Sequence, residues 1–146
     1  MMGTDKIKPG NKEYDGKIKG DPFSVINRCQ AYAADIFIAS AGATKEYRFT
    51  ICKVIQTYAC ELIHQSRQAN SFTLGSLERK NYQNNAVELV NKIDDLLPVI
   101  RRCRCISPQK EEELHKKAYN LKVSFNKWFD SDLRRIKEMS MKEEIT

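Results

Sequence analysis

Residues 45–51 read Lys-Glu-Tyr-Arg-Phe-Thr-Ile and open the stretch that decides the fold. Phe49 and Thr50 are mediocre helix formers, so propensity alone does not explain a helix here. Apolar residues nevertheless recur every three or four positions, as on one buried helix face, at Tyr47, Ile51, Val54, Tyr58 and Leu62, with Ile55 and Ile63 widening the face. We therefore expect one helix from a cap at Thr44 to about Asn70.

Two further helices have recognisable start signals. Asp21 is a capping residue and Pro22 suits the first helical position, so a helix should run from here to Gly42. Its apolar stripe comprises Phe23, Ile26, Ala33, Ile36 and Phe37. Ser107-Pro108 repeats the signal for the last helix, whose inner face comprises Leu114, Ala118, Leu121, Phe125, Trp128 and Ile136.

The third helix is expected from about Ser76 to Arg104, with an inner face of Leu77, Val87, Val90, Ile93, Leu97, Ile100 and Cys103. Because a proline ring removes a helical hydrogen bond, we expect a kink or a break just before Pro98. No segment alternates like a strand. The sequence therefore predicts an all-α, antiparallel four-helix bundle over residues 21–139, between a flexible basic arm (1–20) and a flexible tail (140–146).

The composition is typical of one soluble domain. The 146 residues are 41% hydrophobic and 30% charged, which suffices for a single core. No apolar run approaches the roughly 20 residues that span a bilayer, and residues 1–20 lack the apolar region of a secretory signal. Five cysteines without a Cys-x-x-Cys spacing suit a reducing compartment. We expect a cytoplasmic protein with no membrane contact, cofactor or metal.

The positive charge is concentrated in one part of the chain. The formal net charge is +6, and residues 101–137 alone carry eleven Lys or Arg against five Asp or Glu. Such an asymmetry indicates an anionic partner, with nucleic acid as the first candidate. The alternative is a set of well-solvated helix faces that binds nothing.

The candidate nucleic-acid-binding residues are Arg101, Arg102 and Arg104 at the end of the third helix, and Lys116, Lys127 and Arg134, which form a stripe opposite the apolar face of the fourth. Contacts from Lys and Arg to the phosphate backbone give sequence-independent, salt-sensitive binding. No zinc-finger, helix-turn-helix or similar base-reading pattern is present, so RNA or DNA should be bound without sequence preference.

Catalytic patterns are absent from the sequence. Glu61 and His64 share a helix face, as in half of a carboxylate-bridged metal site, but the matching Glu-x-x-His half is missing. No glycine-rich phosphate loop occurs either. We expect a protein that is not an enzyme, while a metal-dependent enzyme of the bundle core stays as the third alternative.

Several stretches resemble one protein family. They are residues 47–51, 58–63 and 67–70 of the second helix, Leu96-Leu97 with Arg101-Arg102 of the third, the Ile106-Ser107 cap, and Lys127-Trp128. In order and spacing they are similar to the four-helix-bundle family that includes the accessory variability determinant (Avd) of diversity-generating retroelements. Its relatives include proteins encoded in bacterial ribosomal-RNA intervening sequences. The chain departs from the family at Pro98, at Ile51-Cys52, where many members have Gly, and at Asn126-Lys127, where Gly-Gly is frequent.

The resemblance implies a non-enzymatic subunit that assembles into a homo-oligomeric, pentameric barrel. Such a barrel binds the reverse transcriptase of the retroelement, and its basic surfaces contact template RNA or cDNA. Three basic residues are the second candidates, for binding a neighbouring subunit or the polymerase: Arg48, Lys53 and Arg67. The alternative within the same resemblance is a structural or protein-interaction bundle without a nucleic-acid function.

Overall fold

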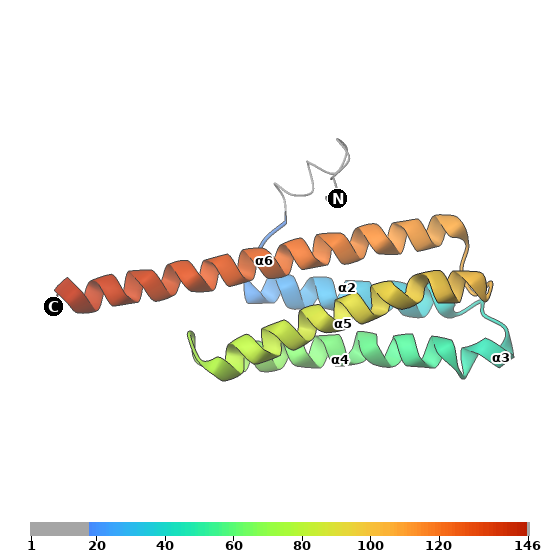
Figure 1. Ribbon diagram of the computed structural model, residues 1–146, viewed down its shortest axis with the longest axis horizontal. Coiled ribbons are helices and arrows are strands. Elements are labelled where there is room, and N and C mark those ends of the chain that lie inside the picture. The colour runs from blue at the N-terminus through green and yellow to red at the C-terminus, as the bar shows by residue number, and fades with distance from the viewer. Residues whose placement is uncertain (1–17, 146) are drawn as a thin grey trace.

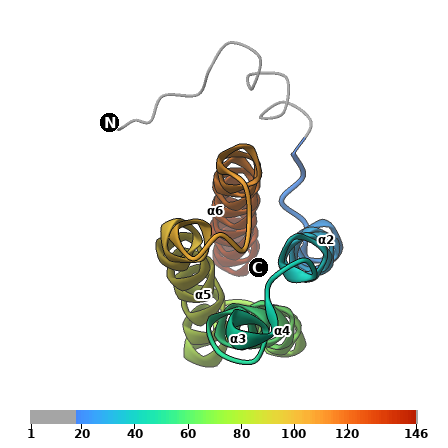
Figure 2. The same cartoon turned by 90° about the vertical axis from the view of Figure 1, so that its right-hand side faces the viewer.

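The computed structural model describes residues 18–145 and consists there of helices and connecting segments, without strands. The helices are α2 (Pro22–Ser40), α3 (Lys45–Arg48), α4 (Ile51–Ser71), α5 (Leu77–Arg102) and α6 (Pro108–Ile145). Figure 1 shows that the four long helices alternate in direction along the chain. Seen from the end, they surround one core, and α6 contacts both α2 and α5 (Figure 2). The predicted bundle of four packed helices is confirmed.

Local capping bonds explain where the long helices begin. The Asp21 side chain accepts a hydrogen bond from the Ser24 backbone N–H at 3.0 Å. The hydroxyl of Ser76 caps α5, and the hydroxyl of Ser107 accepts from the Lys110 N–H at 3.0 Å. Because these bonds join residues three apart, the capping residues predicted at Asp21 and Ser107 could be recognised from the sequence.

The predicted single helix over residues 44–70 is divided in the structure. It is interrupted at Phe49 and Thr50, between the single turn α3 and the long helix α4. The Thr50 hydroxyl donates to the Glu46 carbonyl at 3.0 Å, while the Thr50 N–H bonds to the Tyr47 carbonyl instead. A side chain that takes a backbone acceptor in this way competes with the helical ladder. The two mediocre helix formers therefore mark a break.

Large apolar residues predicted to be buried are in part exposed. Phe23, Phe37, Val54 and Leu77 are exposed, and in α2 and α4 the face that packs inward is rotated by about one position. The face predicted for the last helix is buried from Leu114 to Trp128, and that of the third helix is buried from Val90 to Ile100.

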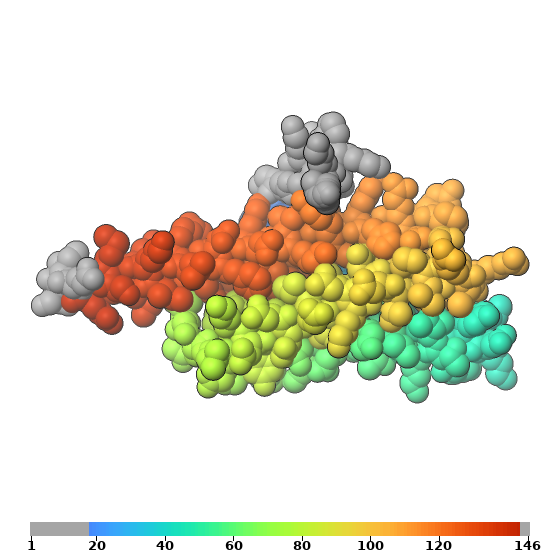
Figure 3. Space-filling view, viewed as in Figure 1, coloured from blue at the N-terminus to red at the C-terminus, as the bar shows by residue number. Residues whose placement is uncertain are grey.

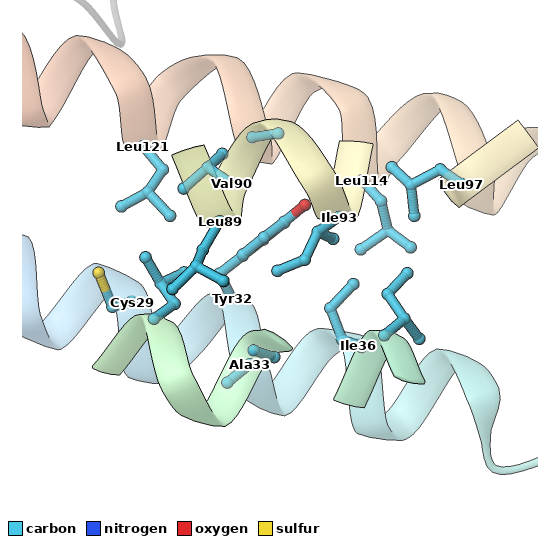
Figure 4. Packing of buried hydrophobic residues seen from close by; sticks show 14 of the residues in the cluster. Cys29, Tyr32, Ala33, Ile36, Leu89, Val90, Ile93, Leu97, Leu114 and Leu121 are labelled. Carbon is cyan, nitrogen blue, oxygen red and sulfur yellow. The ribbon is translucent and has the colours of Figure 1, made fainter. Parts of the chain in front are cut away.

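The inward residues include several small ones outside the predicted stripes, among them Cys29, Cys52, Ala59 and Ser66, together with Ala33, which was predicted. Figure 4 shows Cys29 and Ala33 beside Tyr32 and Ile36 in the core. Small residues allow helices to approach closely. A prediction based on stripes of large apolar residues does not identify such positions.

Helix α5 is not broken at Pro98 and continues to Arg102. Of the kink or break expected before Pro98, the break does not occur. Proline removes one helical hydrogen bond and its ring crowds the carbonyl four residues earlier. The buried side chains of Leu97 and Ile100 nevertheless hold the helix against the core on both sides of Pro98.

The limits of the bundle also differ from the expected ones. Helix α6 continues to Ile145, through the residues after 139 that were expected to form a flexible tail. At the other end, Ile18 is buried, and the carbonyl of Lys19 accepts from the Ser124 hydroxyl at 2.7 Å. The described end of the predicted arm therefore lies against α6, while residues 1–17 lie outside the described part of the chain.

A buried ion pair joins α5 to α6 close to the end of α4. Arg79 donates to both carboxylate oxygens of Asp132 at 2.7 and 2.9 Å, and Gln83 donates to the same carboxylate at 2.9 Å. Another guanidinium nitrogen donates to the Phe72 carbonyl at 3.2 Å, and the guanidinium lies 5.3 Å from the Trp128 ring centre. Nothing in the sequence pattern indicated this pair.

Candidate nucleic-acid interface

The α5–α6 connection presents two of the three predicted arginines to solvent. Arg102 and Arg104 are exposed, whereas Arg101 is half-buried. The three border an open pocket with a volume of ≈ 760 Å³, whose other wall is the start of α6. The negative end of the α5 dipole and the positive end of the α6 dipole both lie at this pocket and offset each other, so its positive charge comes from the arginines.

The backbone of this connection explains how Arg104 is positioned. The Cys105 N–H bonds to the Ile100 carbonyl and the Arg104 N–H to the Arg101 carbonyl, both at 2.8 Å. This pair of bonds is the Schellman motif, which places one residue in the left-handed region, usually a glycine. Here that residue is Arg104, with φ 63°. A side chain at such a position costs about 1 kcal/mol relative to glycine.

Arg101 is part of a charge network at the same corner. It is ion-paired with Glu111, whose other oxygen lies 2.9 Å from His115 Nε2. His115 Nδ1 lies 2.5 Å from Asp94 Oδ1. Burial favours the neutral ring, but the bonds to Asp94 and Glu111 outweigh it and raise the pKa of His115. Arg101 therefore has an intramolecular partner, which its position in the sequence did not reveal. The spacing of Glu111 and His115, four residues apart in one helix, could have predicted only the contact between these two.

The predicted stripe along α6 is not uniformly open. Lys116 is exposed and lies 3.8 Å from Glu112, and Arg134 is exposed near the start of α2. Lys127, between them, is half-buried and donates to the Ile18 carbonyl at 2.9 Å. A Cβ at Gly20 would meet the Lys127 backbone at 2.5 Å, so the chain crosses closely here. The stripe is therefore covered at its centre by residues 18–20.

The six predicted residues also lie far apart. Arg102 and Arg104 are at one end of the bundle, and the turn of α6 that carries Arg134 is near the other. From Pro108 to Arg134 the helix rises about 39 Å. The structure brings together the three arginines of the α5–α6 connection, and it separates them from Lys127 and Arg134.

The second candidates occupy three different surroundings. The Arg48 guanidinium donates to the Ala43 carbonyl at 3.1 Å and so helps to fix the α2–α3 connection. Lys53 is exposed beside an open, mainly apolar pocket of ≈ 650 Å³ that Phe49, Val54 and Cys103 also border. Arg67 is exposed about 21 Å further along α4.

A groove between α2 and α6 was not foreseen. Its volume is ≈ 490 Å³, and its lining includes Arg28, Tyr32 and Lys116. Across it Lys117 donates to Asp35 at 2.7 Å. The Tyr32 hydroxyl is buried without a hydrogen-bond partner among the described residues, and burial, with Asp94 and Asp35 nearby, raises its pKa. Positive and negative side chains alternate in this groove, so it does not extend the arginine surface.

Two of the thiols and the possible metal ligands can be assessed for reactivity in the described part of the chain. Within it, no cluster of His, Cys, Asp or Glu could hold a metal ion. Burial raises the pKa of Cys29 to about 12 and that of Cys105 to about 11, so neither thiol is a ready nucleophile. Among residues 18–145, no helix combines the length and apolar character needed to cross a membrane.

The chain was compared with protein-family models, with curated proteins and with solved structures, and none of the three comparisons gave a match.

Proposed function

We propose that this protein is a non-enzymatic accessory of a diversity-generating retroelement. It binds the reverse transcriptase and template RNA or cDNA through basic surfaces, and so supports mutagenic reverse transcription. The observation that carries the nucleic-acid role is the exposed pair Arg102 and Arg104 beside an open pocket. Glycine would suit the backbone at Arg104 better, so a binding role accounts for this arginine where loop stability does not.

The mechanism is phosphate-backbone binding by a repeated surface. Each copy offers a small number of cations, which alone gives weak and salt-sensitive binding. Assembly into a homo-oligomer, a pentameric barrel by the family resemblance, presents several such surfaces to one nucleic acid strand. Affinity then rises through effective concentration, without base-specific contacts.

A structural or protein-interaction bundle without nucleic-acid binding is the second candidate. It is favoured by the partners of three predicted cations. Arg101 pairs with Glu111, Lys116 lies near Glu112, and Lys127 bonds to a backbone carbonyl. On this account most of the positive charge in residues 101–137 stabilises the fold and keeps it solvated.

The double variant Arg102→Ala/Arg104→Ala tests the nucleic-acid role directly. Titration with fluorescent single-stranded RNA and DNA of mixed sequence, at several salt concentrations, should show weaker binding of every sequence. The slope of the logarithm of the association constant against the logarithm of the salt concentration is negative. It should become less steep by about 1 for each lost phosphate contact. The matched control is Lys45→Ala/Lys80→Ala, which removes the same charge from exposed positions elsewhere. Equal affinity of the two variants would leave the structural bundle as the function.

The assembly and the polymerase are tested separately. Light scattering of the nuclease-treated protein should give about five times the mass of the 16.9 kDa chain for a simple pentamer. Co-expression with a reverse transcriptase encoded next to the gene and a variable repeat should yield a stable complex. A gene that instead lies within a ribosomal-RNA insertion would favour the second candidate.

A further inference from the structure

The last part of α6 extends beyond the bundle. The segment of residues 133–145 is called here the α6 overhang. It begins beside the start of α5, where Leu133 and Ile136 help to line a pocket with Arg79. Its later turns continue past the starts of α2 and α5 (Figure 1) and stand clear of the other helices (Figure 3). From Leu133 to Glu143, only Ile136 is partly buried, and every other side chain is exposed. The overhang is about 20 Å long.

This exposed helix carries apolar side chains along one side. Leu133 and Met139 are 58% and 54% exposed, and Ile136 lies between them at spacings of three. At the base of the overhang, Leu77 is 69% exposed, next to an open pocket of ≈ 310 Å³ that Phe129 and Ile136 help to line. Exposed apolar side chains that gather on one side of a helix indicate an interaction site.

The charges of the overhang indicate which partner covers it. Its first turns carry Arg134, Arg135 and Lys137, followed by Glu138, and its last turn carries Lys142, Glu143 and Glu144. A parallel pair of overhangs would place the arginines of both copies together. An antiparallel pair places the basic turns of each copy opposite the acidic end of the other, which is favourable.

We propose that the α6 overhang binds the overhang of a second copy of this chain in an antiparallel, two-fold arrangement. Met139 lies near the two-fold axis, and Arg135 of each copy faces Glu143 of the other. The tip of the partner helix then reaches the base of the overhang and covers Leu77 and the neighbouring pocket. The contact is self-complementary and closed, as two-fold interfaces are. A contact between two overhangs of about 20 Å is smaller than a standard interface.

This interface does not depend on the nucleic-acid role. The contact is two-fold and closed, so it doubles the mass of the unit that the chain forms without it. Sedimentation velocity of the full-length, nuclease-treated protein over a range of concentrations measures that mass. Met139→Asp places two carboxylates at the axis and should halve the mass at every concentration where the wild type is paired. An unchanged mass in this variant would overturn the proposal.

A charge exchange tests the antiparallel orientation. Arg135→Glu alone sets Glu against Glu143, and Glu143→Lys alone sets Lys against Arg135, so each should self-associate roughly tenfold more weakly. An equimolar mixture of the two variants restores both pairs and should associate like the wild type. The control Lys45→Glu makes the same charge change at the far end of the bundle. Full self-association of Arg135→Glu, or no recovery in the mixture, would overturn the arrangement.

Met139, Arg135 and Glu143 are exposed, so these variants should leave the fold unchanged. Circular dichroism and thermal unfolding verify that each variant retains the helical bundle. Salt provides an independent measurement, because charge pairs at the surface are screened. Pairing of the wild type should weaken as salt rises, whereas pairing that strengthens with salt would show that charge does not select the partner.

Discussion

Helix α5 has arginines at both ends, and their environments are opposite. Arg79 lies in its first turn, whereas Arg102 and Arg104 lie at its end and in the connection to α6. Arg79 is 5% exposed, and its guanidinium is fully engaged by Asp132 and by backbone carbonyls. Arg102 and Arg104 are exposed beside an open pocket. The difference shows that the number of positive charges says little about binding. An arginine contributes to a surface for anions only where the fold leaves its guanidinium in water.

The largest effect is expected at the buried pair. Arg79→Ala leaves the Asp132 carboxylate buried without its counter-ion, and should lower the free energy of unfolding by about 3–5 kcal/mol. Chemical denaturation of the purified variant measures this loss. Replacement of both partners, by Arg79→Met/Asp132→Leu, should cost less than Arg79→Ala, because no charge stays buried. A double variant less stable than Arg79→Ala would contradict the account of this pair.

A gain in stability is expected at Arg104. Arg104→Gly relieves the left-handed conformation and should raise the free energy of unfolding by up to about 1 kcal/mol. Arg104→Ala keeps the strain and should leave stability close to that of the wild type. Both variants should lose the same nucleic-acid affinity. Thermal unfolding and RNA titration of the two variants separate the effect of backbone strain on stability from the effect of the side chain on binding. Equal stabilities of the two variants would show that Arg104 is not strained.

A smaller effect is expected from pH at the α5–α6 corner. The pKa of His115 is raised in the folded protein, because Asp94 and Glu111 outweigh the burial of the ring. A histidine whose pKa is higher in the folded than in the unfolded protein stabilises the fold at pH values below its unfolded pKa, which is near 6.5. This stabilisation is lost as the pH rises through the folded pKa. The stability difference between wild type and His115→Gln should therefore be larger at mildly acidic than at alkaline pH. It should stay under about 1 kcal/mol, since the ring is partly exposed. The opposite trend would show that Asp94 and Glu111 do not hold the charged ring.

The smallest effect is expected at Arg102. Its side chain is exposed, so Arg102→Ala should change the free energy of unfolding by less than about 0.5 kcal/mol. Its effect should be confined to nucleic-acid titrations. A loss of stability comparable to that of Arg79→Ala would mean that the two environments differ less than their exposure indicates.

The sequence correctly predicted the helical class, the number of long helices and several of their starting points. Asp21 and Ser107 could be recognised because a cap acts on an N–H three residues away. The unusual pair Phe49 and Thr50 was noticed for its poor propensity, and that property turned out to mark a helix break. The three arginines of the α5–α6 connection were close in sequence and stay close in the structure.

Other features depended on contacts between distant parts of the chain. Asp132 pairs with Arg79 from 53 positions away, and residues 18–20 cover Lys127 from more than a hundred positions away. The choice between two adjacent helix faces was made by small residues such as Cys52 and Ala59. Local hydrogen bonds and helical periodicity act within one turn, so the sequence alone determined where the helices are and where charge accumulates. Burial and ion pairing arise only when helices pack, so only the tertiary structure decided which cations stay exposed and which part of α6 is left without a neighbour.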